Sequence, residues 1–158
     1  MKEIQFDDIE GLKAEIKDDF GAFGPAAALS QEMINQFAEI TGDHQWIHVD
    51  VARCEKESPF GGPIAHGFLT LSMVASMTPG SNYKVSGYGN ATNYGSDGFR
   101  FLSPVPAGSQ VHACTRLVNV QAKPKGTLLT TETAVHVVGS DRPALVYKGL
   151  VMFNPPLG

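Results

Sequence analysis

Residues 67–78 form a segment that is apolar on almost every side, and four stretches with the character of strands follow it. Apolar residues at positions 68, 69, 71, 73, 74 and 77 are typical of a helix that is buried on most sides. The stretches 91–103, 110–121, 127–138 and 144–154 are separated by short turn-forming runs, which predict antiparallel hairpins. We therefore expect an α+β fold in which an antiparallel sheet wraps around a long central apolar helix.

The first half of the chain predicts a well-capped helix. A short strand is expected over 26–29, and Ser30 is a suitable N-cap for the helix that follows. An apolar stripe at helical spacing comes next, made of Met33, Phe37 and Ile40. Gly42 can adopt the left-handed conformation that ends a helix, so the chain leaves the helix there and presents Asp43 in a loop. One more short helix is expected over 51–57.

Composition bounds the number of domains and the class of function. A chain of 158 residues suits one domain, spanning 1–158. The formal charge of -4, without clustered Lys and Arg, argues against nucleic-acid binding and disfavours a membrane surface. Cys54 and Cys114 lie too far apart in sequence to suggest a disulfide framework or a zinc knuckle. The acidic first ten residues are unlike a signal peptide, and the run near 68–77 is too short to span a bilayer. A cytoplasmic protein is expected.

The segment 41–50, which reads TGDHQWIHVD, places two acids and two histidines within ten residues. Trp46 and Ile47 lower the local dielectric, which shifts pKa values toward those that suit proton transfer near neutral pH. Asp43 and His48 are five residues apart and can converge in a loop, where they could hold and polarise a water molecule. Taken alone, Asp43 could instead cap a turn, and His48 could be a hydrogen-bonded core residue.

A second cluster, PIAHG over 63–67, comes immediately before the apolar helix. The first N–H groups of a helix lack internal partners and the helix dipole favours negative charge there, so this turn can stabilise a developing oxyanion. Gly67 has no side chain to keep a substrate carbonyl away. An acid–base pair and an oxyanion site are together the minimum for adding water and a proton next to a thioester carbonyl.

Both motifs resemble a known family. Asp43 and His48 in TGDHQWIH, followed by FGGPIAHGFLTLS from residue 60, resemble the signature of MaoC-like (R)-specific enoyl-CoA hydratases, which adopt the hotdog fold. The segment 93–109, NYGSDGFRFLSPVPAGS, is similar to the NodN-like branch. The resemblance implies that Asp43 and His48 act on the catalytic water and that the Gly67 N–H binds the thioester oxygen. The implied reaction is syn hydration of trans-2-enoyl-CoA to (R)-3-hydroxyacyl-CoA, or the reverse dehydration, in fatty acid metabolism.

The same resemblance adds two candidates for substrate binding. It also shows two positions at which this sequence differs from the usual pattern of the family. His66 either orients the oxyanion turn through a backbone hydrogen bond, which we favour, or contacts substrate. Tyr94 lies on the predicted strand that carries the NodN-like segment. The family's commoner Asn-Pro pair is replaced by Gln45-Trp46, and the serine that some members have late in the following helix aligns with Ala75. Both departures bear on rate and substrate range.

The implied chemistry also sets the expected cofactors and partners. No cofactor and no metal are expected, because CoA enters as part of the acyl-CoA thioester substrate. Only 18% of residues are charged, and a charge-poor small domain often hides part of its surface against a partner. Together with the family resemblance, this predicts a homodimer with the pocket near or between subunits.

Three other readings stay open on the sequence alone. His48-Val49-Asp50 with His112 or His136 could form a two-histidine, one-carboxylate metal site, as in metal oxygenases. The same fold could instead carry a thioesterase, in which water attacks the carbonyl. The third reading is a module that binds acyl thioesters without turning them over.

Overall fold

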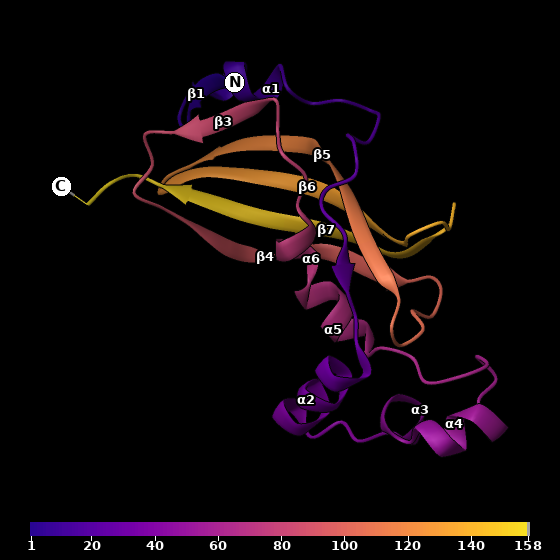
Figure 1. Ribbon diagram of the computed structural model, residues 1–158. Helices are drawn as coiled ribbons and strands as arrows, with labels where there is room; N and C mark the ends of the chain where they lie inside the picture. Colours follow the sequence, from indigo (N-terminus) through magenta and orange to yellow (C-terminus); the bar gives the residue numbers. More distant parts are fainter. Residues whose placement is uncertain (158) are drawn as a thin grey trace.

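Five strands form one curled antiparallel sheet in the order β2–β5–β6–β7–β4 (Figure 1). The structure is a computed structural model and describes residues 1–157. The strands are β2 (Ala27–Ala28), β4 (Asn90–Phe101), β5 (Gln110–Lys123), β6 (Gly126–Val137) and β7 (Pro143–Asn154). Every neighbouring pair is antiparallel, and the strand bounds differ from the predicted ones by two residues at most. The predicted hairpins β5–β6 and β6–β7 are confirmed. The hairpin predicted between β4 and β5 is wrong, because β4 pairs with β7 at the other edge of the sheet.

The apolar segment that precedes the sheet forms two short helices, α5 (Gly67–Ser72) and α6 (Val74–Met77). Its helical character is confirmed, but the continuous helix predicted over 67–78 is interrupted at Met73. The Ser72 hydroxyl donates to the carbonyl oxygen of Phe68, and the Ser76 hydroxyl donates to the carbonyl oxygen of Met73 itself. Such bonds compete with the helical hydrogen bonds and weaken the helix at that point.

The main core lies between these two helices, the segment around α2 and one face of the sheet. Its fully buried members are apolar and come from all of these elements: Leu29, Ile34, Ala65, Leu69, Met77, Val105, Val111, Ala113, Val135, Ala144 and Leu145. Phe68, by contrast, is 57% exposed. Burial of the helical segment on most sides is therefore not achieved within one chain.

Helix α2 (Gln31–Thr41) has the caps that the sequence predicted. The Ser30 hydroxyl accepts a hydrogen bond from the first turn, and Gly42 ends the helix at φ 76°. The predicted stripe is wrong at Ile40, which is 82% exposed. Ile34 is the centre of the buried face, and a residue six positions later lies about 240° around the helix, on the solvent side. The residues that pack on the core are Met33, Ile34, Phe37 and Ala38.

The N-terminal elements were not predicted from the sequence. β1 (Lys2–Gln5) pairs in parallel with β3 (Tyr83–Ser86), and α1 (Ile9–Lys13) lies beside them. They cover a second apolar cluster made of Ile4, Leu12, Leu117, Val120 and Leu129. In Figure 1 these elements and helix α2 lie at opposite ends of the molecule. Within residues 1–157, no helix has the length and apolarity needed to cross a membrane.

The segment after α2 carries the predicted site residues on short elements. A helical turn, α3 (Trp46–Val49), leads to α4 (Val51–Glu57), and Asp50 caps α4 by accepting a backbone N–H at 3.0 Å, as predicted. The N–H of Ile64 donates to the carbonyl oxygen of Ile47 at 3.0 Å. This bond holds the loop that leads to α5 against α3, so the two sequence motifs meet in space.

Candidate active site

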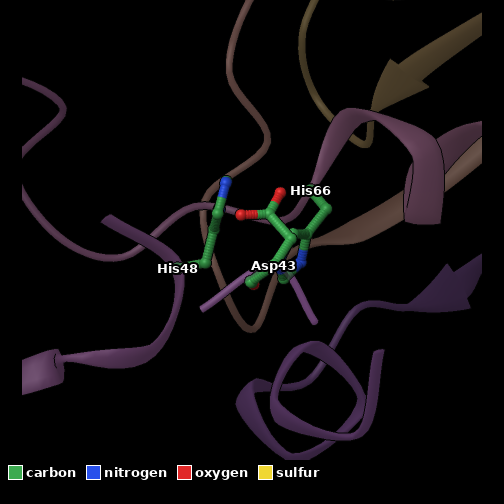
Figure 2. A group of neighbouring side chains, drawn as sticks. All are labelled: Asp43, His48 and His66. Atoms are coloured by element: carbon green, nitrogen blue, oxygen red, sulfur yellow. The ribbon is translucent and has the colours of Figure 1, made fainter. Parts of the chain in front are cut away.

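The fold brings Asp43, His48 and His66 together from three different segments (Figure 2). One carboxylate oxygen of Asp43 and one ring nitrogen of each histidine lie within 4.8 Å of one another. Figure 2 shows the Asp43 carboxylate directed toward a ring nitrogen of His48. Asp43 and His48 converge because Asp43 lies in the loop that follows α2 and His48 lies five residues later on α3.

His48 lies on α3, and one of its ring nitrogens makes a hydrogen bond to the backbone. It is 7% exposed, and its Nδ1 lies 2.7 Å from the carbonyl oxygen of Ile64. A carbonyl oxygen can only accept, so Nδ1 carries the hydrogen. In the neutral ring, Nε2 therefore has a free lone pair. The structure thus gives the imidazole the tautomer that a base acting through Nε2 needs.

The pKa of His48 is lowered from its usual value of 6.5. Burial is the largest cause, because a buried imidazolium loses hydration, and nearby His66 acts in the same direction. The hydrogen bond to the Ile64 carbonyl and the charge of Asp43 act in the opposite direction. The net effect favours the neutral form, the form that can accept a proton.

Asp43 lies in an exposed loop that begins at Gly42, the left-handed end of α2. Its carboxylate oxygen Oδ1 accepts a hydrogen bond from the Gln45 N–H at 3.4 Å. Its backbone carbonyl oxygen lies 2.9 Å from Nε2 of His66. Asp43 thus combines an accessible carboxylate with a backbone held against a buried ring.

His66 connects the elements of the site. It is 3% exposed and stacks on His48, with ring centroids 3.9 Å apart and ring planes 26° apart. Phe37 covers it at a centroid distance of 5.1 Å. Nδ1 of His66 is buried and has no hydrogen-bond partner among residues 1–157. The predicted preference for a backbone hydrogen bond agrees with this geometry, although the carbonyl it meets belongs to Asp43 rather than to the turn itself.

A pocket of about 350 Å³ opens beside His48 and Gly67. Gly67 is the first residue of α5, so no carbonyl of the same helix can accept its N–H. The ring of Phe101 covers Gly67 so closely that an added Cβ would lie 2.8 Å from it. The pocket walls are largely apolar: His48, Phe60, Ile64, Ala65, Gly67, Phe68, Thr70, Phe101, Leu102, Ser103, Pro104, Val105 and Ala144. Such a wall suits an acyl chain whose polar end meets His48 and Gly67.

Tyr94 does not belong to this group. It is 63% exposed on β4 and is part of neither the pocket wall nor the Asp43 cluster. It occupies a bulge, because Asn93 and Gly95 pair with consecutive residues of β7. Its role in substrate binding stays a prediction.

The geometry does not support the metal-oxygenase reading among residues 1–157. Asp50 caps α4, whereas His112 and His136 lie on β5 and β6 with the ring of Phe23 stacked on His112 at 3.7 Å. The group of ligand-type side chains that contains His48 includes none of these three residues.

Comparisons with known proteins agree with the fold. Residues 14–138 match the model of the MaoC like domain. The 3-hydroxyacyl-thioester dehydratase Z of Mycobacterium tuberculosis is 45% identical over 126 residues, which cover 79% of this chain and 82% of that protein. Nodulation protein N of Rhizobium meliloti is 38% identical over 158 residues, which cover 98% of this chain and 96% of that protein. A solved (R)-hydratase from A. caviae, involved in PHA biosynthesis, superposes with a TM-score of 0.66 at 21% identity. The superposition covers 85% of this chain and 96% of the hydratase.

The chain belongs to the MaoC-like dehydratase family and has its hotdog fold. It is an enzyme of the hydratase and dehydratase class. The resemblance read from TGDHQWIH and PIAHG, including the NodN-like segment, is confirmed.

Apart from His48 and Gly67, sequence reasoning did not single out the residues of the pocket wall. Phe60 lies in the second motif, and Phe101 and Leu102 lie in the NodN-like segment, but neither segment indicated which of its residues would line a pocket. Thr70 is also part of the wall, one helical turn after His66, and is 2% exposed. The HxxxT spacing on a helix is the one sequence signal that could have indicated Thr70.

Proposed function

We propose that this protein catalyses the hydration of trans-2-enoyl-CoA to (R)-3-hydroxyacyl-CoA, and the reverse dehydration, with Asp43 and His48 as the acid–base pair. The observation that carries the proposal is the free Nε2 of a neutral His48 beside the Asp43 carboxylate, with His48 part of the wall of an apolar pocket. The thioester substrate is supported by the 45% identity to a 3-hydroxyacyl-thioester dehydratase. The (R) configuration rests on the family resemblance of the two motifs.

The first step uses both side chains on one water molecule. His48 Nε2 accepts a proton from the water, and the Asp43 carboxylate accepts a hydrogen bond from its other hydrogen. The oxygen forms a bond to the β carbon as the β carbon–α carbon π bond breaks. The electron pair moves to the thioester oxygen, where the Gly67 N–H stabilises the enolate.

The second step returns the proton. The enolate collapses, and the α carbon takes a proton from the His48 imidazolium, which restores the starting protonation state. Oxygen and hydrogen then arrive from the same face, which gives syn addition. Proton transfer of this kind needs no added cofactor, because CoA enters on the substrate.

Two substitutions test the acid–base pair. Asp43→Asn and His48→Ala should each lower kcat/KM for crotonyl-CoA by about 10²- to 10⁴-fold, followed as loss of enoyl-thioester absorbance. Circular dichroism and thermal melting show whether each variant is folded. His44→Ala is the matched control, because His44 is an exposed histidine in the same loop. Near-normal turnover by folded Asp43→Asn or His48→Ala would remove the assignment.

The products separate this proposal from the other readings. Chiral analysis of the 3-hydroxyacyl product should give the (R) form. Release of free CoA thiol from acyl-CoA, without hydration, would point to a thioesterase. Saturable binding of enoyl-CoA without turnover at any chain length would point to a binding module.

We further propose a homodimer that joins two copies along β4. This strand pairs with β7 on one side and ends the sheet on the other, and nearly all of its residues are exposed. Exposed aromatic side chains extend from β4 to α5, including Tyr94, Phe101 and Phe68. Sedimentation should give twice the mass of the 16.9 kDa chain. Tyr94→Glu should weaken the dimer, and a monomeric native protein would contradict the pairing.

A further inference from the structure

We propose that His66 is a positioning residue whose Nε2–H holds the backbone of Asp43 in its productive place beside His48. The inference rests on the proposed function, because it assigns catalysis to Asp43 and His48. It concerns a different interaction, the bond between a buried ring and the loop that carries the carboxylate.

The Asp43 loop has little else to hold it. Asp43 makes two other hydrogen bonds among residues 1–157, with the Thr41 hydroxyl and the Gln45 N–H. Both are 3.4 Å long and reach residues two positions away. The bond to His66 is 2.9 Å long and crosses 23 residues of sequence. It is therefore the short bond that fixes the loop against the rest of the fold.

The donor ring is itself immobilised. His66 is buried and packs against the rings of His48 and Phe37, and its carbonyl oxygen accepts the Thr70 N–H at 3.1 Å in the first turn of α5. Since the Asp43 carbonyl can only accept, Nε2 must carry the hydrogen and Nδ1 has the lone pair in the neutral ring. That Nδ1 has no partner among residues 1–157. Buried groups without partners are uncommon in native structures and require an explanation such as a functional role.

His66 thus adjoins each part of the proposed machinery. Its ring donates to the Asp43 carbonyl and stacks on His48, and its backbone is directly followed by Gly67. Because a shift of about 1 Å in a reacting group can cost about 100-fold in rate, loss of the Nε2–H donor should act on kcat. KM should change little, since His66 is not part of the pocket wall.

A pair of variants separates the hydrogen bond from the ring. The amide N–H of Gln can reach the place of Nε2, so His66→Gln retains a donor without the ring. His66→Phe retains a flat ring without the donor. We expect His66→Phe to lower kcat for crotonyl-CoA by about 10- to 100-fold with KM within about two-fold. His66→Gln should stay within about five-fold of the native kcat. His44→Phe is the control for an aromatic substitution in the same region.

A second measurement needs no activity. Hydrogen exchange of the amides in 42–46 should be faster in His66→Phe than in the native protein and close to native in His66→Gln. ¹⁵N shifts of the native protein should show a protonated Nε2 and a bare Nδ1 on His66, which tests the bond even if a variant does not fold. If the native enzyme hydrates no enoyl-CoA, the proposed function fails, while exchange and tautomer still decide the role of His66.

The overturning results are specific. The positioning role would be contradicted if His66→Phe kept the native kcat. It would also be contradicted if folded His66→Gln and His66→Phe lost kcat equally, or if hydrogen exchange in His66→Phe were unchanged. A His66 tautomer protonated at Nδ1 alone would do the same.

Discussion

The Nδ1–H of His48 donates to the carbonyl oxygen of Ile64 across 2.7 Å, while the N–H of Ile64 donates to the residue just before His48. The two motifs of the sequence are thereby joined by a pair of hydrogen bonds in opposite directions. One of these bonds also sets the tautomer of the proposed base. Structure and chemistry at His48 therefore depend on different ring nitrogens and can be separated by substitution.

His48→Asn should separate them. The side-chain amide of Asn can occupy the place of Nδ1 and donate to the Ile64 carbonyl, but it offers nothing at Nε2. We expect kcat/KM to fall by about 10²- to 10⁴-fold while the melting temperature stays within a few degrees of native. His48→Ala should melt lower, because a buried carbonyl left without a donor costs about 1–3 kcal/mol. Substantial hydratase activity in His48→Asn would contradict the role of Nε2.

The lowered pKa of His48 predicts how activity depends on pH. Because the base must be neutral, kcat/KM should hold as pH falls past 6.5, the usual pKa of histidine, and decline only at lower pH. A decline centred above pH 6.5 would contradict the effect of burial. A pH–rate profile with a substrate that does not ionise in this range provides the measurement.

The same shift predicts a loss of stability in acid. Between the folded pKa and 6.5, the unfolded chain binds more protons at His48 than the folded chain does, so the free energy of unfolding decreases as pH falls below about 6.5. Burial and His136 also lower the pKa of His112, which adds to this slope. Urea unfolding at pH 7.5 and 5.5 should therefore show a smaller pH effect in His48→Asn than in the native protein. If pH changed the free energy of unfolding equally in both proteins, the pH dependence would come from groups other than His48.

The sequence could predict the elements whose signals are local. Ser30 and Gly42 mark the ends of α2, and the loop after Gly42 brings Asp43 near His48. The stack of His66 on His48 could not be predicted, because it depends on how two segments pack and on side-chain rotamers. The parallel pairing of β1 with β3 likewise depends on tertiary contacts, for which local sequence patterns carry no signal. The interruption of the apolar helix differs, because Ser72 and Ser76 are visible in the sequence and bond to carbonyls three and four residues away.

Gly67→Ala should impair the site through Phe101. The new Cβ would meet the Phe101 ring at 2.8–2.9 Å, so the ring must move, and it lines the same pocket. We expect about a 10-fold loss in kcat/KM, a value typical of a small displacement at a reacting centre. The double variant Gly67→Ala with Phe101→Ala should recover part of the loss relative to the sum of the single effects. Strict additivity in this double-mutant cycle would show that the two positions do not interact.

Phe60→Ala should change the preference for acyl chain length rather than the chemistry. Phe60 is partly exposed at the pocket wall, so its removal costs the fold little but removes apolar contact with a bound chain. Because burial of apolar surface is worth about 25 cal/mol per Å², KM should rise several-fold for longer enoyl-CoA substrates and less for crotonyl-CoA, with kcat nearly unchanged. Phe23→Ala is the control, since Phe23 is another exposed phenylalanine and is not part of the wall. An equal rise in KM at every chain length would place the acyl chain away from Phe60.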